Sequence, residues 1–181
     1  QAEDGIRYIG VTGVQTCALP ICYMREMGGI FPHLTLYSKR KSENEDVIIH
    51  IPIPDELMKS EELKDKFVTD IVPQLAKQLQ KDFEIYGVAW TCEAWVRKSS
   101  KEDGVPDNWK DLPIDGEILM VNIEFENKNE MIIYDVERTG KQVTEDGDIV
   151  DHVDLLERDL SEAEGWSGRF TGLLKKFTTR S

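Results

Sequence analysis

Basic residues are scarce in this chain of 181 residues, which has 22 lysines and arginines against 35 aspartates and glutamates and a formal net charge of −13. Binding to nucleic acids without sequence preference needs basic side chains that displace counterions from the phosphates. Docking on an anionic membrane needs basic patches for a related reason. The composition therefore argues against direct non-specific nucleic-acid binding and against attachment to a membrane.

Histidine is also rare, and the sequence lacks the common catalytic and cofactor motifs. The three histidines, His33, His50 and His152, show no pair at a metal-ligand spacing, and no Ser-His-Asp or Cys-His set is legible. No glycine-rich loop that could cradle a phosphate occurs, and the stretch TEDGDIVD lacks the spaced carboxylates of a calcium loop. We therefore expect no cofactor and interpret each histidine as a structural or surface residue.

The opening stretch, residues 1–21, fits no ordinary targeting or structural pattern. It starts with acidic residues, whereas a secretory signal starts with basic ones. It is too short and too polar to cross a bilayer. Gly10, Gly13 and Pro20 would interrupt a helix.

Two parts of this stretch, QAEDGIR and VTGVQTCALPI, resemble the translation of an Illumina sequencing-library adapter in order, frame and junction. Between them lie Tyr8, Ile9 and Gly10, where a sample index would sit, although the adapter would encode aspartate in place of Tyr8. The resemblance implies that residues 1–21 are a disordered assembly artefact. It further implies that residues 22–181 are a single domain truncated at its N-terminus, from a shotgun assembly of microbial or phage DNA.

Cysteine is nearly absent once this opening segment is set aside. Cys22 lies at the junction, and Cys92 is then the only internal cysteine. One cysteine can form neither an internal disulfide nor a cysteine-based zinc site. Its apolar neighbours predict a buried and unreactive thiol. A reducing compartment is the expected setting, and we expect a cytoplasmic protein.

Periodicity along the rest of the chain predicts an α+β domain. Strands at 33–37 and 47–51, joined by a charged loop, predict an N-terminal hairpin. Later strands at about 84–98, 117–126, 130–138 and 149–156 predict an antiparallel meander of about four strands.

One long helix is expected from about Glu61 to Phe83, with Ser60 as its N-cap. Its apolar residues form one face that would pack on the sheet. Pro73 removes a backbone donor in its middle, which predicts a kink. A short amphipathic helix is expected in the tail, where four apolar residues share a face: Phe170, Leu173, Leu174 and Phe177.

Alternation along the strands assigns their inward faces. The expected inward sets are Tyr86, Val88, Trp90, Cys92, Ala94 and Val96 on the first long strand, Leu119, Val121, Ile123 and Phe125 on the next, and Ile132, Tyr134 and Val136 on the third.

With these inward sets, the carboxylates Glu93, Glu124 and Asp135 fall together on the outer face of the sheet. Grouped carboxylates can hold Mg²⁺ or Mn²⁺ for the hydrolysis of phosphoesters. A divalent-metal-dependent hydrolase or nuclease that uses these three ligands is therefore one candidate function. A solvated sheet face is the simpler interpretation of the same residues.

Apolar side chains such as Trp95, Met120 and Ile133 are expected on that same outer face, and solvated faces rarely expose such a group. The face is then either covered by the chain itself or used for self-association or a protein partner. The basic tail around Phe170, Leu174 and Phe177 is a second candidate for a partner surface, unless it packs on the sheet.

The absence of a catalytic set favours a small intracellular, non-enzymatic interaction or assembly protein. The metal-dependent hydrolase is the alternative.

Overall fold

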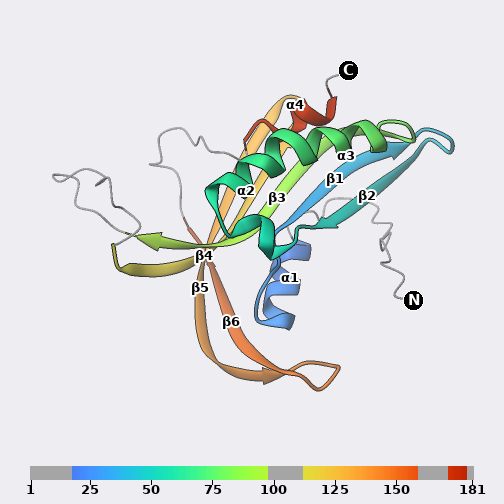
Figure 1. Ribbon diagram of the computed structural model, residues 1–181. Helices are drawn as coiled ribbons and strands as arrows, with labels where there is room; N and C mark the ends of the chain where they lie inside the picture. The colour runs from blue at the N-terminus through green and yellow to red at the C-terminus, as the bar shows by residue number, and fades with distance from the viewer. Residues whose placement is uncertain (1–17, 98–111, 159–170, 179–181) are drawn as a thin grey trace.

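The computed structural model describes residues 18–97, 112–158 and 171–178. Six strands form one curled antiparallel sheet in the order β2-β1-β3-β4-β5-β6 (Figure 1). The strands are β1 (His33–Arg40), β2 (Glu45–Pro52), β3 (Phe83–Arg97), β4 (Ile114–Phe125), β5 (Lys128–Val143) and β6 (Ile149–Glu157). The expected α+β architecture, with a hairpin and a meander in one sheet, is confirmed.

The expected long helix is present and kinked. It runs through α2 (Glu61–Lys66), the π-turn η2 (Phe67–Ile71) and α3 (Val72–Leu79), after a short 3₁₀ turn η1 (Asp55–Met58). The Ser60 hydroxyl caps its start by accepting a hydrogen bond from the Leu63 N–H at 3.2 Å. The Val72 N–H donates to the Phe67 carbonyl five residues back, directly before Pro73, which has no N–H to donate. The helix ends before the expected Phe83, because that residue begins β3.

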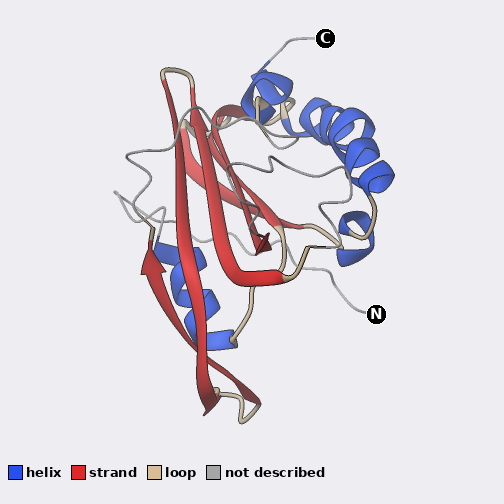
Figure 2. Ribbon diagram, turned by 90° about the vertical axis from the view of Figure 1, so that its left-hand side faces the viewer, coloured by secondary structure: helices blue, strands red, loops and turns tan. Residues whose placement is uncertain are grey.

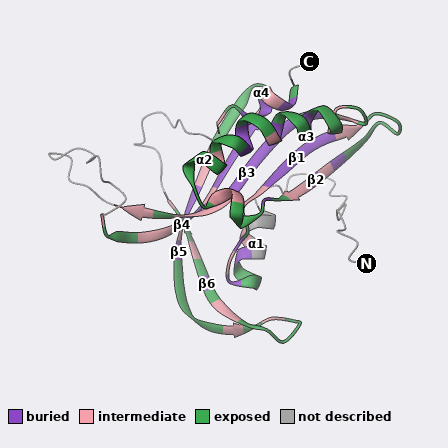
Figure 3. Ribbon diagram, in the orientation of Figure 1, coloured by how far each residue is buried: buried purple, intermediate pink, exposed green. Residues whose placement is uncertain are grey.

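The largest core lies between this kinked helix, the tail helix α4 (Leu173–Thr178) and one side of the sheet, which we call the helix face. Trp90 of β3 is buried there against Phe67, with ring centroids 6.1 Å apart. Leu174 and Phe177 of the tail are also buried in this core. Burial follows the strands under the helix in Figure 3. The described part of the tail therefore packs on the sheet, and Phe170 lies outside the described residues.

The opposite side of the sheet, which we call the α1 face, is also covered. The helix α1 (Ala18–Met27) packs against β6 and lies across the sheet from the kinked helix (Figure 2). Met24 is fully buried there beside Leu119 and Val153. Ile21, within the stretch that resembles the adapter, packs against this same cluster.

The inward sets expected for β3 and β4 lie on opposite faces of the sheet, which is a correction. Trp90 pairs with Asn122 and Cys92 with Met120, so these residues share the helix face. Leu119, Val121 and Ile123 face the other way. Both faces of β3 and β4 are largely buried, so both sides of these two strands carry apolar residues. Alternation alone therefore cannot relate the faces of one strand to those of the next.

A β-bulge overturns the expected inward position of Tyr86. Tyr37 pairs with Gly87 and Ser38 pairs with Ile85, so Tyr86 is an extra residue on β3. Ile85 takes the buried place on the helix face, and Tyr86 is 42% exposed. Gly87 lies directly beneath the rings of Tyr37 and Phe125, whose centroids are 5.3 Å apart.

None of the helices in the described residues is long and apolar enough to cross a bilayer.

Gly87→Ala is expected to destabilise the fold by about 1–3 kcal/mol, because the new methyl group overpacks the aromatic pair. A Cβ at this position would lie 2.6 Å from Phe125 Cδ1 and 3.0 Å from Tyr37 Cδ2. Gly116→Ala is the matched control, since a Cβ there meets nothing within 4 Å. Chemical unfolding of both variants measures the difference, and equal stabilities would contradict the expectation.

Candidate functional site

Arg138 of β5 is the centre of a polar cluster that joins three other strands to the end of α1. Its Nε and Nη2 donate to the two carboxylate oxygens of Glu117 on β4, at 2.9 and 2.6 Å. Its Nη1 donates to the Gly28 carbonyl at 2.5 Å and to Asp151 of β6 at 3.3 Å. Its Nη2 lies 3.5 Å from Glu93 of β3. The Arg138 guanidinium therefore forms ion pairs with three carboxylates.

The pKa values of the residues in this cluster are shifted in different directions. Hydrogen bonds from Arg138 lower the pKa of Glu117, and this partner in turn raises the pKa of Arg138. The ammonium group of Lys141, 2.5 Å away, lowers the pKa of Asp151. Burial raises the pKa of Glu93, and Arg138 offsets this rise only in part. Of the three carboxylates, Glu93 lies farthest from the guanidinium. Glu93 is thus the carboxylate in the cluster with the least compensated charge.

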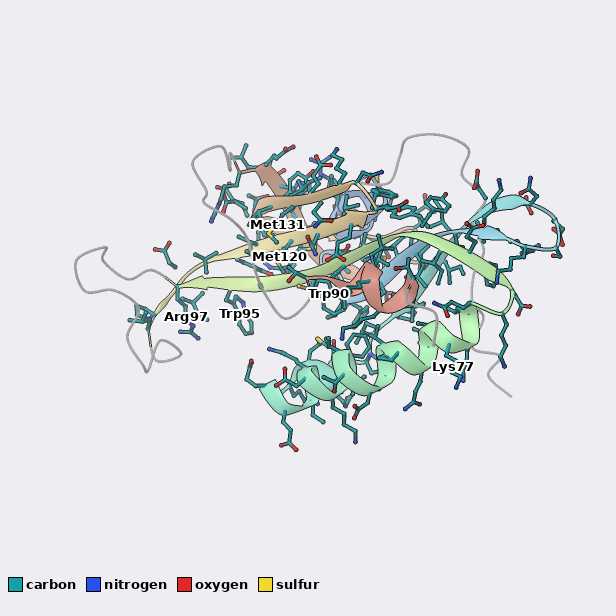
Figure 4. The ribbon with its side chains drawn as sticks, turned by 90° about the horizontal axis from the view of Figure 1, so that it is seen from above. Lys77, Trp90, Trp95, Arg97, Met120 and Met131 are labelled. Carbon is teal, nitrogen blue, oxygen red and sulfur yellow. The ribbon has the colours of Figure 1, made fainter. Side chains whose placement is uncertain are left out.

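Glu93 also lines a pocket of about 590 Å³, which we call the β3-end pocket. The walls are formed by Met27 and residues 29–32 after α1, by Asp55 of η1, and by residues 93–95 of β3. The Ile30 N–H donates to the Glu93 carboxylate and fixes it in place. Three of the apolar side chains on the walls are exposed: Met27 by 41%, Phe31 by 61% and Trp95 by 69%. Figure 4 shows Trp95 near the free end of β3, away from the buried Trp90.

The three carboxylates expected to hold Mg²⁺ or Mn²⁺ are not brought together. Glu93 lies on the α1 face, whereas strand register places Glu124 and Asp135 on the helix face. Glu124 accepts from the Gly172 N–H at 2.6 Å and the Leu174 N–H at 2.8 Å, so it anchors the tail helix. Asp135 forms an ion pair with Arg158. Among the described residues, no three His, Cys, Asp or Glu side chains are grouped to hold a metal ion.

The apolar surface expected around Trp95, Met120 and Ile133 is divided in the same way. Trp95 is exposed on the α1 face. Ile133 is buried on the helix face, and Met120 is half-buried against the helix-face core. Only Trp95 of this group is therefore available at the surface, and Phe31 and Met27 accompany it.

The hairpin of β1 and β2 brings His33 and His50 together, which the search along the sequence missed. Their ring centroids are 6.2 Å apart with an interplanar angle of 65°. His33 pairs with Pro52 and Thr35 with His50 in the strand register. The search along the sequence compared only nearby histidines, and these two are neighbours across a hairpin. Pairing residues outward from the expected turn would have found them.

Burial raises the pKa of Cys92 to about 11, in keeping with the expected inert thiol.

Comparison with family models, with curated proteins and with solved structures finds no match to this chain.

Glu124→Gln is expected to lower the free energy of unfolding by about 1–3 kcal/mol. The carboxylate is only 4% exposed and accepts two backbone N–H groups, and an amide turns one of its oxygens into a donor. Glu137→Gln, on an exposed position of β5, is the control and should change little. Urea denaturation compares the two, and an unchanged midpoint for Glu124→Gln would refute the anchoring role.

Glu93→Gln is expected to gain stability relative to the wild type as the pH rises from about 4.5 to 7. The folded-state pKa of Glu93 is raised above its usual 4.5. The folded protein therefore holds this proton more tightly, and the contribution is present at low pH and lost as the pH rises through the folded pKa. Glutamine does not titrate and escapes that loss.

Free energies of unfolding of the wild type and the variant, measured across this pH range, test the sign. Glu84→Gln on an exposed position of β3 serves as the control. A difference that stays constant, or that grows in favour of the wild type, would show that Glu93 is not strained by burial.

Proposed function

We propose that the protein is a non-enzymatic interaction module that docks a partner protein at the β3-end pocket. The proposed occupant is a segment of the partner in which an apolar side chain stands beside a lysine or arginine. The observation that carries the proposal is the exposure of Met27, Phe31 and Trp95 around one cavity.

The apolar walls support binding of a side chain from another molecule. Single exposed apolar residues are common on soluble proteins, whereas several around one hollow are typical of ligand and partner sites. A volume of about 590 Å³ lies within the usual range of binding pockets. An aromatic or long aliphatic side chain that enters between Phe31 and Trp95 would remove apolar surface of both molecules from water.

The charge around the pocket supports a basic neighbour in the bound segment. Glu93 and Asp55 lie on the walls, and Arg138 is already shared among three carboxylates. The chain as a whole carries a formal charge of −13. A cation beside Glu93 would stabilise the ionised carboxylate that burial disfavours, whereas an anionic segment would be repelled.

Titration of the ¹⁵N-labelled protein with two short peptides tests this proposal. Acetyl-Lys-Trp-Lys-amide should shift the backbone resonances of Gly29, Ile30 and Ala94, and acetyl-Glu-Trp-Glu-amide should bind clearly more weakly. Trp95→Ala should reduce the affinity about tenfold or more, since buried tryptophans at interfaces are frequent hot spots.

Ile149→Ser is the matched control, because Ile149 is similarly exposed on β6 and does not line the pocket. Equal binding of both peptides would contradict the proposed charge preference. Shifts elsewhere on the surface, or an affinity unchanged by Trp95→Ala, would contradict the proposed site.

A further inference from the structure

We propose that His33 and His50 form a binding site for a divalent transition-metal ion, coordinated through the Nε2 atoms of both rings. The site lies on the β1–β2 hairpin at the α1 face of the sheet, next to Thr91 of β3. It adjoins the β3-end pocket at Phe31, but its two ligands do not line that pocket, and it involves none of Glu93, Glu124 and Asp135. Zn²⁺ is the probe that tests it.

The separation of the two rings fits a shared ion. A histidine nitrogen binds Zn²⁺ at about 2.0–2.1 Å, which places the ion about 3.2 Å from the ring centroid. Two rings on one ion then have centroids about 5.2 Å apart at a tetrahedral angle and at most about 6.4 Å apart. The observed 6.2 Å is about 1 Å longer than the tetrahedral value, so side-chain rotation has to bring the two rings closer when they share an ion.

Hydrogen bonds at the Nδ1 atoms orient both rings for this role. His33 Nδ1 lies 3.0 Å from the Phe31 carbonyl oxygen, which can only accept, so Nδ1 carries the hydrogen. In the neutral ring the lone pair is then on Nε2. His50 Nδ1 lies 3.0 Å from the Thr35 hydroxyl, which can accept in the same way. Metal-binding histidines commonly donate their other N–H to such a group.

The Nε2 atoms of both rings are open to a ligand. In the described part of the chain, the ring-nitrogen contacts of His33 and His50 are the two Nδ1 contacts. With the hydrogen on Nδ1, each Nε2 presents a lone pair to a cation.

Thr91 provides an independent sign that a polar ligand belongs here. It pairs with His33 in the strand register, so both side chains lie on the same face. Thr91 is fully buried, and its Oγ1 has no hydrogen-bond partner among the described residues. A buried hydroxyl without a partner is costly. Water bound to an ion at His33 would give this hydroxyl a partner, with solvent completing the coordination.

The ligand types select the class of ion. Imidazole nitrogens suit Zn²⁺, Cu²⁺ and Ni²⁺, whereas Mg²⁺ and Mn²⁺ prefer carboxylate and other oxygen ligands. We therefore expect no measurable binding of Mg²⁺ at this pair. The expected ion thus differs from the Mg²⁺ or Mn²⁺ that the carboxylates Glu93, Glu124 and Asp135 suggested in the sequence.

Calorimetric titration of the full chain with ZnCl₂ at neutral pH is the first experiment. His33→Gln and His50→Gln should each weaken binding by more than about tenfold, and Thr35→Val by about tenfold through loss of ring orientation. His152→Gln is the matched control, since His152 is half-exposed on β6 and bonded to Gln142. Loss of binding in His152→Gln to the same degree would overturn the proposal.

Long-range ¹H–¹⁵N spectra of the wild type make the test independent of any variant's folding. Zn²⁺ should shift the Nε2 resonances of His33 and His50 and leave those of His152 in place. Thr91→Val should raise the melting temperature of the metal-free protein while weakening Zn²⁺ binding. Unshifted His33 and His50 resonances at saturating Zn²⁺, or no heat of binding, would overturn the site.

Discussion

Burial of β3 on both faces is the constraint on which the rest of the structure depends. The kinked helix and α4 cover one side of this strand, where Trp90 is buried. On the other side, Ala89 is buried in a cluster with Tyr37, Val121 and Ile123 of the neighbouring strands. A strand enclosed in this way carries mainly apolar or small side chains over its middle, and its charged groups lie nearer its ends. Glu93 and Trp95 lie near one end, and Tyr86 lies at the bulge near the other.

Charged residues at the borders of this layered core hold the smaller helices in place. Glu124 accepts hydrogen bonds from N–H groups at the start of α4, and Arg138 donates to the Gly28 carbonyl just after α1. A short helix has little intrinsic stability, and its packing and end contacts determine its position. Two of the carboxylates predicted to bind a metal, Glu93 and Glu124, thus accept hydrogen bonds from backbone N–H groups of peripheral segments and hold these segments on the sheet.

The sequence predicted the elements well because their signals are local. Ser60 and Pro73 mark the start and the kink of the long helix, and both features are present. The face assignments failed because they depend on strand register and on covers that alternation does not report. The bulge at Tyr86 inverts the pattern within one strand, and a second buried face removes the contrast between inward and outward residues. The predicted cluster of Glu93, Glu124 and Asp135 followed from these incorrect face assignments. The pair of His33 and His50 was missed because the two residues are neighbours only across the hairpin.

The irregular segment between α1 and β1 explains why one end of the sheet carries both candidate sites. Its backbone polar groups are taken up by the sheet: the Gly28 carbonyl by Arg138, the Ile30 N–H by Glu93, and the Pro32 carbonyl by the Ile53 N–H. A segment fixed in this way needs no regular secondary structure. Ile30 is buried in the core, whereas Phe31 is exposed. Phe31 then presents its ring to the pocket while its carbonyl orients His33. The same backbone thus supports two chemically distinct surfaces, one apolar and acidic, the other built on two imidazole rings.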